Sequence, residues 1–257
     1  MASAARTRWR LLESDAADGA TNMATDVALL ALARETGEPT LRLYTWSGPT
    51  LSFGRHERTR GRFDAARLAA AGVDVVRRPT GGRALLHHRE VTYSIAAPVA
   101  DSESLRARCD WINARLLQAL ELLGVSAAPA AARERTQLPG SSACFSEPNR
   151  GEIVADNRKL VASAQFVEDG AFLQHGSILL HDDQSRIAAL CSAPEAPTSA
   201  ISLSALLARE VTGAEVCGAV VEAFAGEDAG DGGLAPARTI EHLDRDFFRS
   251  DSWTWRR

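Results

Sequence analysis

The chain has 257 residues, a formal net charge of −4, 45% hydrophobic residues and 24% charged residues. This composition is typical of a soluble globular protein with a sizeable core, and a weakly acidic chain gives no reason to expect nucleic acid as a partner. No apolar run approaches the roughly 20 residues of a membrane span, and residues 1–10 lack the apolar stretch of a secretory signal. We therefore expect a cytoplasmic protein that does not contact membranes.

The first half of the chain alternates short strands with helices. Residues 22–34 place Met23, Val27 and Leu30 at helical spacing among alanines, which predicts a helix. Residues 41–46 alternate apolar and polar side chains and end at a Ser-Gly-Pro turn, which is typical of a strand. The same reasoning predicts strands at residues 9–13, 50–54, 73–77 and 91–95, and a helix at residues 64–71.

The second half contains the clearest helix and the clearest hairpins. Residues 110–123 place Ile112, Leu116 and Leu120 on one helix face, and Gly124 follows as a stop. Strands are predicted at residues 152–155, 160–167 and 172–180, with tight turns at 156–157 and 169–170 between them. Further helices are predicted near residues 185–191, 203–209 and 214–224.

The order of these elements favours an α+β fold built on a mixed, mainly antiparallel sheet flanked by helices. The whole chain, residues 1–257, is expected to form a single domain. Within it, the Gly-rich and acidic residues 226–236 are typical of a flexible connector. The short C-terminal tail either docks through its Trp residues or is mobile.

The four cysteines differ in their surroundings. Cys109, Cys191 and Cys217 lie in or beside apolar helical stretches, as small buried hydrophobic residues do. Cys144 instead lies in a polar loop next to predicted strands, which is a plausible place for a nucleophile. No Cys-x-x-Cys pair exists, so the sequence supports neither a zinc site nor a thioredoxin-like motif, and free thiols in a reducing compartment are expected.

Other polar residues leave two interpretations open. Lys159, at the end of a predicted hairpin turn, would favour a nearby thiolate, but a lysine at a turn is more commonly exposed and without function. His175 is either a core histidine with satisfied hydrogen bonds or a base, and His87 or His88 could line a pocket.

Residues 77–83 form the second notable segment, with the sequence RRPTGGR. Paired glycines let the backbone approach a ligand closely and direct N–H groups at a carbonyl or phosphate oxygen. The spacing does not match the common phosphate-binding loop, so a simple glycine turn between strands is an equal alternative.

Several segments taken together resemble the lipoate/octanoate protein ligase and transferase family, part of the biotin/lipoate A/B protein ligase superfamily. They are NMATD at residues 22–26, PTLRLYTW at 39–46, RRPTGGR at 77–83, His87, TYS at 92–94, CF at 144–145, RK at 158–159, SAQ at 163–165 and LQHGS at 173–177. Within the family, the chain looks most similar to the octanoyl-[acyl carrier protein]:protein N-octanoyltransferases that use a cysteine.

The resemblance implies a function and a set of site residues. Cys144 matches the cysteine that forms an acyl-thioester, and Lys159 matches the lysine that lowers its pKa. The donor would be octanoyl-acyl carrier protein, the acceptor a lysine of a lipoyl-domain protein such as the glycine-cleavage H protein, and no metal or cofactor would be needed. The matching substrate-binding positions are Arg78, Gly81, Gly82, His87, Ser163, Ala164, Gln165, His175 and Gly176.

The resemblance also implies a fold with an acyl tunnel, as in biotin and lipoate ligase catalytic domains. This chain departs from the family pattern at two positions. Ala162 stands where the family usually has Gly, which we expect to tighten the acyl pocket. His88 stands where Asp usually follows His87, which we expect to remove an acidic contact.

Two other functions remain open. An ATP-dependent lipoate–protein ligase, acting through an acyl-adenylate, would use an overlapping site. The stretch after Leu180 is expected to be too short for the extra C-terminal domain that many such ligases carry, which favours transfer. A non-catalytic acyl-carrier binding protein is the third hypothesis, and the presence of both Cys144 and Lys159 argues against it.

Overall fold

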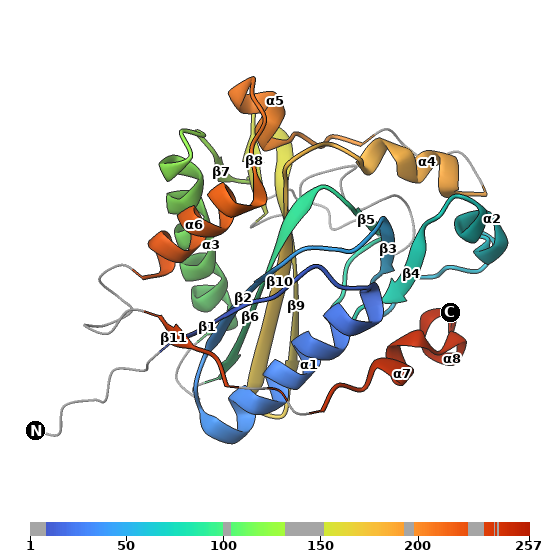
Figure 1. Cartoon of the computed structure of the whole chain (residues 1–257), viewed down its shortest axis with the longest axis horizontal. Helices are drawn as coiled ribbons and strands as arrows, with labels where there is room; N and C mark the ends of the chain where they lie inside the picture. The colour runs from blue at the N-terminus through green and yellow to red at the C-terminus, as the bar shows by residue number, and fades with distance from the viewer. Residues whose placement is uncertain are drawn as a thin grey trace, which may run out of the picture.

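The computed structural model describes residues 9–99, 104–131, 152–192, 198–225, 234–238, 240 and 242–257. Within them, the main sheet has eight strands in the order β11-β1-β2-β6-β10-β9-β8-β7 (Figure 1). Its strands are β1 (Arg10–Glu13), β2 (Thr40–Tyr44), β6 (Glu90–Pro98), β7 (Ala128–Pro129), β8 (Ile153–Ala155), β9 (Arg158–Glu168), β10 (Ala171–Leu179) and β11 (Ala235–Pro236). From β2 to β7 the neighbours are antiparallel, whereas β1 is parallel to β2 and β11. The mixed, mainly antiparallel sheet is thus confirmed.

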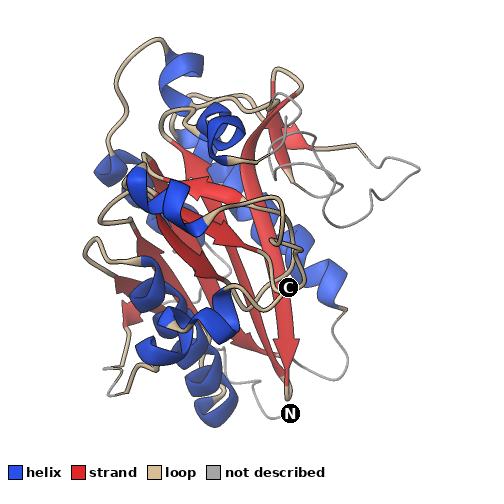
Figure 2. Ribbon diagram, turned by 90° about the vertical axis from the view of Figure 1, so that its right-hand side faces the viewer, coloured by secondary structure: helices blue, strands red, loops and turns tan. Residues whose placement is uncertain are grey.

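Helices cover both faces of this sheet. One face packs against α3 (Leu105–Leu122) and α6 (Gly213–Phe224), with Tyr93, Ile112 and Phe172 among the fully buried residues of this core. The other face packs against α1 (Gly19–Thr36), where Leu29 and Leu30 meet the sheet. Figure 2 shows the long strands of the main sheet between these helices. The chain is therefore an α+β fold.

A second sheet of three strands carries residues 77–83 over the α1 side of the main sheet. Its order is β4-β3-β5, with β3 (Thr50–Phe53), β4 (Asp74–Arg77) and β5 (Leu85–His87). β4 enters the glycine-containing residues and β5 leaves them, so this small sheet fixes both ends of the segment. Phe53, Phe63, Leu68 and Leu86 form a separate small core behind it.

The shorter helices are α2 (Ala65–Ala70), the 3-10 helix η1 (Gln184–Arg186), α4 (Ile187–Leu190), α5 (Leu203–Leu207), α7 (Arg245–Arg249) and α8 (Asp251–Thr254).

Local sequence explains both ends of the long helix α1. The Asp18 carboxylate accepts a hydrogen bond from the N–H of Thr21 at the start of α1, and Gly37 closes the helix with a φ of 71°. No helix in the described residues is both long and apolar enough to cross a membrane.

Both predicted hairpin turns are confirmed. Asp156 and Asn157 have φ angles of 49° and 58°, and Asp169 and Gly170 have 47° and 77°. Two-residue hairpin turns of type I′ require positive φ at both central residues, which Asp, Asn and Gly tolerate best. These turns fix the register of β8, β9 and β10.

The C-terminal part departs from the prediction. Ala235 and Pro236, expected within a flexible connector, form β11, where the N–H of Ala235 donates to the carbonyl of Trp9 at 3.0 Å. Residues 226–233 of that connector lie outside the described residues. The tail docks: Trp253 is 9% exposed, and its indole N–H donates to the carbonyl of Arg77 at 2.7 Å. The chain end therefore supports the strand that leads into residues 77–83.

Candidate functional site

The β9–β10 hairpin divides the predicted site residues between two faces of the sheet. Pairing places His175 opposite Ala164, and Gly176 opposite Ser163. Side chains alternate along a strand, and Ile178, two residues beyond Gly176, lies in the core under α3 and α6. Gly176 and Ser163 therefore belong to the face covered by α3 and α6, which we call the helix face. His175 and Ala164 belong to the opposite face, which we call the loop face because residues 77–83 cover it.

Lys159 reaches the loop face through an irregularity in β9. Ile153 pairs with Val161, and Val154 pairs with Lys159, so Leu160 is an extra residue in a β-bulge. Leu160 and Val161 both pack into the helix-face core. Residues paired directly across two strands lie on the same face of a sheet, so Lys159 lies on the same face as Val154. Val154 follows the core residue Ile153 and therefore lies on the face opposite to that core. The bulge thus turns Lys159 toward the loop face.

Lys159 is fully buried and forms an ion pair with Glu152, with 2.6 Å between Nζ and Oε2. The expectation that a turn lysine is exposed is wrong here, because residues 199–201 run beside β9. The N–H of Lys159 donates to the carbonyl of Ser199 at 2.7 Å, and its carbonyl accepts from Ile201 at 3.0 Å. Glu152 was not predicted as a site residue, although a glutamate directly before a short apolar strand is a usable signal.

Arg78 holds residues 77–83 in shape. Its guanidinium donates to the carbonyl and the hydroxyl of Ser52 at 3.0 and 2.8 Å, and to the carbonyls of Gly81 and Arg83 at 3.0 and 2.7 Å. Gly82 has a φ of 94°, and a Cβ there would lie 2.7 Å from the Arg78 guanidinium. Glycine is therefore required at this position both by the backbone and by the close approach of Arg78.

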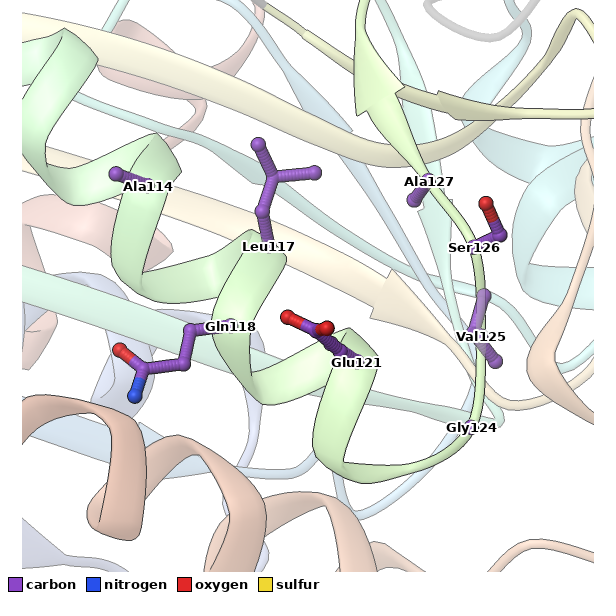
Figure 3. Close-up of a pocket in the computed structure, with 8 residues that line it drawn as sticks. All are labelled: Ala114, Leu117, Gln118, Glu121, Gly124, Val125, Ser126 and Ala127. Carbon is purple, nitrogen blue, oxygen red and sulfur yellow. The ribbon is translucent and has the colours of Figure 1, made fainter.

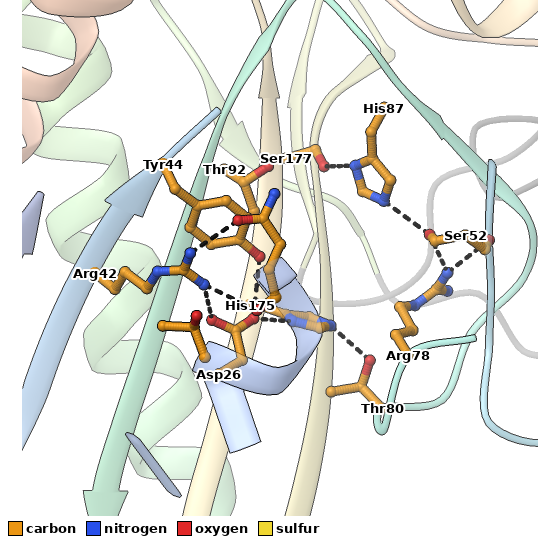
Figure 4. Close-up of polar contacts among 12 residues, drawn as sticks. Asp26, Arg42, Tyr44, Ser52, Arg78, Thr80, His87, Thr92, His175 and Ser177 are labelled. Atoms are coloured by element: carbon orange, nitrogen blue, oxygen red, sulfur yellow. Dashed lines mark hydrogen bonds and ion pairs between the residues drawn. The ribbon is translucent and has the colours of Figure 1, made fainter. Parts of the chain in front are cut away.

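His175 connects residues 77–83 to α1 through a buried chain of polar groups (Figure 4). Its Nε2 lies 2.7 Å from the Thr80 hydroxyl, and its Nδ1 lies 2.9 Å from the Asp26 carboxylate. Asp26 also accepts hydrogen bonds from Arg42 at 2.8 Å and Tyr44 at 3.0 Å. Because a carboxylate only accepts, Nδ1 carries the proton in the neutral ring and the Thr80 hydroxyl donates to Nε2.

The charge state of Asp26 follows from these contacts. Burial raises the pKa of the Asp26 carboxyl group. The Arg42 charge and the hydrogen bonds from His175 and Arg42 together lower it by more than burial raises it, so the pKa lies below its usual value. The sequence carried a signal for Asp26. It follows Met23 by three residues and therefore lies on the buried side of α1.

His87 occupies a second chain of the same kind, also drawn in Figure 4. Its Nε2 lies 2.7 Å from the Ser52 hydroxyl, its Nδ1 lies 2.7 Å from Glu90, and its ring stacks on Trp46 at 3.9 Å. Burial lowers the pKa of His87 by more than the Glu90 charge raises it. The imidazole is therefore neutral at pH 7.

His87 nevertheless has an acidic partner, because Glu90 supplies a carboxylate from β6. The neighbouring His88 is more exposed and its Nδ1 lies 3.0 Å from Asp183. One oxygen of Glu90 also accepts from Ser177 at 2.6 Å and Thr92 at 2.7 Å. Its second oxygen has no hydrogen-bond partner among the described residues.

The helix face carries a separate line of polar side chains. The hydroxyls of Ser163 and Tyr93 lie 2.7 Å apart, Gln174 donates to Tyr93 at 2.8 Å, and Gln165 donates to Gln174 at 3.2 Å. Burial raises the pKa of Tyr93 to about 12. Ser163 and Gln165 thus lie across the sheet from Lys159 and His175. Gly176 lies on the helix face beside Tyr93 and Ser163. A Cβ at this position would overlap the carbonyl of Ala162 and the Tyr93 ring.

The structure therefore brings His175 and residues 77–83 together on the loop face, with His87 close by, and places Lys159 and Ala164 on that same face. Cys144 lies outside the described residues, so its distance from Lys159 is not part of this geometry. A groove of about 680 Å³ lies elsewhere, between α3 and residues 124–127 (Figure 3). Its lining residues are Ala114, Leu117, Gln118, Glu121, Gly124, Val125, Ser126 and Ala127, and none of them is a predicted site residue. Among the described residues, no cluster of His, Cys, Asp and Glu could hold a metal ion.

Comparison with known proteins agrees with the resemblance in the sequence. The model of the lipoyl protein ligase A/B catalytic domain matches residues 18–225. The chain is 37% identical to the octanoyltransferase LipM of Kyrpidia tusciae, over 97% of this chain and 99% of that protein. It is 32% identical to the octanoyltransferase LipM of Bacillus subtilis, over 97% and 98%.

Solved structures agree on the fold. A lipoate-protein ligase A bound with ATP superposes with a TM-score of 0.80 at 20% identity, covering 97% of this chain and 99% of that one. A putative lipoate protein ligase from T. acidophilum with bound lipoic acid gives 0.76 at 20% identity, with the same coverage. With a catalytic-domain model that spans most of its length and full-length relatives above 30% identity, the chain belongs to the lipoyl protein ligase A/B catalytic-domain family.

Proposed function

We propose that this protein is an octanoyltransferase of lipoate biosynthesis, which moves an octanoyl group from an acyl carrier protein to a lysine of a lipoyl-domain protein. The observation that carries the proposal is the full-length similarity to proteins named octanoyltransferase LipM, at 37% and 32% identity. A buried lysine on the loop face, the face that residues 77–83 cover, is consistent with acyl-transfer chemistry.

The first step is exchange of one thioester for another. The Cys144 thiolate attacks the donor carbonyl, a carbon–sulfur bond forms to Cys144, and the bond to the carrier sulfur breaks. The carrier leaves as a thiolate and takes up a proton. An ordinary thiol with a pKa of about 8.5 is only a few per cent thiolate at pH 7, and lowering that pKa by about two units corresponds to about 2.7 kcal/mol.

The second step forms an amide. The neutral amine of the acceptor lysine attacks the Cys144 thioester, a carbon–nitrogen bond forms, and the bond to the Cys144 sulfur breaks. One proton leaves the nitrogen and one thiolate is regenerated. Because an amide is more stable than a thioester, this step is downhill and no ATP is required.

Lys159 supplies positive charge in this proposal. Its ammonium would stabilise the Cys144 thiolate and the oxyanion that develops on the acyl carbonyl. A buried ammonium needs a partner anion, and Glu152 provides one at 2.6 Å. We assign Glu152 the role of holding Lys159 in place. The N–H groups of Gly81 and Gly82 are proposed as further donors to the oxyanion.

Mass spectrometry of the intact protein tests the proposal. The enzyme is incubated with octanoyl-carrier protein in the absence of ATP, and we expect an octanoyl adduct on Cys144. Cys144→Ala should give neither adduct nor transfer, whereas Cys217→Ala, the matched control, should give both. In a separate incubation with ATP, pyrophosphate release that depends on free octanoate or lipoate, without an adduct, would establish the ATP-dependent ligase instead. Full turnover by a folded Cys144→Ala variant would rule out the covalent mechanism.

A further inference from the structure

Positive charge is concentrated on the loop that follows β3. Residues 55–62 read RHERTRGR, with Arg55, Arg58, Arg60 and Arg62 in eight positions. The single acidic residue, Glu57, is buried and pairs with Arg62 at 2.8 Å. The chain as a whole has a net charge of −4, so this loop is a local exception to an acidic composition.

The chain end adds two more arginines to the same surface. The N–H groups of Thr59 and Arg60 donate to the carbonyl of Arg257 at 3.0 and 3.3 Å. The Arg256 guanidinium stacks over Trp253 at 3.9 Å. We call the resulting surface the arginine patch, and its members are Arg55, Arg58, Arg60, Arg256 and Arg257.

The electrostatics of His56 reflect this concentration of charge. Its pKa is lowered first by desolvation and then by the charges of Arg257, Arg55 and Arg256. Arg58 and Arg60 are exposed, and neither forms an ion pair within the described ranges. Their guanidinium groups therefore face solvent without a neutralising partner in that part of the chain.

The patch borders the candidate site. The N–H of Arg55 donates to the carbonyl of Thr80 at 2.7 Å, and the Arg55 guanidinium lies 4.7 Å from the Phe166 ring on β9. Figure 1 shows the C-terminus beside β4, the strand that leads into residues 77–83. A ligand that enters between residues 77–83 and β9 would therefore pass the patch.

We propose that the arginine patch is the docking surface for the acyl donor, an acidic carrier protein whose thioester arm contains a phosphodiester. This inference rests on the proposed function. Guanidinium groups bind phosphate and carboxylate oxygens through paired hydrogen bonds. The donor brings a phosphate on the arm that enters the site, whereas the acceptor brings a lysine. The donor is thus the partner that fits arginines at the entrance.

Charge neutralisation at two exposed positions tests the surface. Arg58→Gln/Arg60→Gln removes two charges from the patch, and Arg34→Gln/Arg106→Gln removes two from exposed ion pairs elsewhere. We expect the first variant to raise the KM for octanoyl-carrier protein about tenfold at low salt and to weaken its salt dependence. Its kcat and the KM for the lipoyl-domain acceptor should be unchanged, and the control variant should remain within about twofold of the unmodified enzyme.

Other results would overturn the inference. A rise in the acceptor KM with an unchanged donor KM would assign the patch to the acceptor, and unchanged values for both would remove its docking role. An equal loss with octanoyl-pantetheine, which lacks carrier and phosphate, would mean that the substitutions distort the site. If the unmodified enzyme transfers nothing, the proposed function fails, and fluorescence anisotropy with labelled holo-carrier protein still compares binding by the two variants.

Discussion

The helix face of the main sheet is packed mainly with apolar side chains, whereas the loop face buries charges and imidazoles. On the helix face, Val161 and Ile178 meet across β9 and β10 in a continuous core. On the loop face, Lys159 pairs with Glu152 and Asp26 pairs with Arg42, all four with side chains at most 8% exposed. The same two strands therefore separate residues that stabilise the fold from residues that hold charge in a fixed position.

This difference has an energetic consequence. Burying an ion pair costs desolvation free energy that the attraction within the pair repays only in part, so well-packed apolar residues often stabilise a fold as much. Removing one partner is worse, because the other remains buried without neutralisation. We infer that the loop-face pairs are kept for geometry and chemistry rather than for stability, and substitutions can test this against the helix face.

Lys159→Met should give the largest effect on activity. We expect transfer to fall by about two to three orders of magnitude, because the proposed mechanism uses the Lys159 charge to stabilise the thiolate and the oxyanion. The midpoint pH for alkylation of Cys144 by iodoacetamide should also rise toward the free-thiol value of about 8.5. Val161→Ala, two residues along the same strand, should cost about 2 kcal/mol of unfolding free energy and leave kcat nearly unchanged.

A double variant separates chemistry from stability at the same position. Lys159→Met removes the positive charge that faces Glu152 at 2.6 Å, and Lys159→Met/Glu152→Gln removes the opposing buried negative charge as well. The double variant should recover much of the lost unfolding free energy, measured by urea titration, without recovering transfer. Recovery of transfer together with stability would show that Lys159 has only a structural role. An unchanged alkylation profile in Lys159→Met would remove its effect on the Cys144 pKa.

His87 should make the loop face sensitive to mild acid, an effect of intermediate size. Its pKa in the folded protein is lowered by burial, so below about pH 6.5 the unfolded chain binds a proton more readily than the folded protein does. The unfolding free energy should therefore fall as pH decreases from 6.5 through the lowered pKa. His87→Gln should show a flatter dependence between pH 7 and pH 5, measured by urea titration at each pH.

A control histidine on the surface completes this comparison. His242 is exposed, and His242→Gln should retain the pH dependence of the unmodified protein. If His87→Gln and the unmodified protein lose stability in parallel between pH 7 and pH 5, protonation of His87 does not contribute. On the helix face, the buried Tyr93 does not titrate in this range, because its pKa is about 12.

The sequence predicted the elements with strong periodicity and missed those set by tertiary contact. The helix at residues 110–123 and both hairpin turns are confirmed, because apolar spacing and positive-φ residues act locally. The strands β5, β7 and β11 have two or three residues and carry no pattern of their own. β11 exists because its backbone pairs with β1, which lies more than 200 residues earlier.

The residue types of the candidate site could be selected from the sequence, but the sheet face on which each side chain lies could not. Lys159, His175 and residues 77–83 could be selected from the sequence, and they share the loop face. A regular alternation along β9 would place Lys159 on the helix face with Val161, and only the bulge at Leu160 reverses this. Glu152 and Asp26 carry local signals in the sequence, but the side chains with which they pair are set only when the fold brings separate strands and helices together.

The smallest effects are expected at the cysteines that lie away from the loop face. Cys109 and Cys217 lie on α3 and α6, and burial raises the pKa of both thiols. Cys191 is 4% exposed in the core behind the small sheet. Each change to Ala should cost about 1 kcal/mol or less, with Cys191→Ala the largest of the three, measured by urea titration.

Combining the three changes sharpens the contrast with the proposed nucleophile. Cys109→Ala/Cys191→Ala/Cys217→Ala leaves Cys144 as the single thiol. Because a raised pKa keeps a thiol protonated at pH 7, Cys109 and Cys217 should contribute little to alkylation, and the triple variant should be inactivated by iodoacetamide as fast as the unmodified enzyme. Resistance of the triple variant to iodoacetamide, with transfer intact, would place the sensitive thiol among these three cysteines. Fast inactivation of both proteins would leave Cys144 as the thiol on which activity depends.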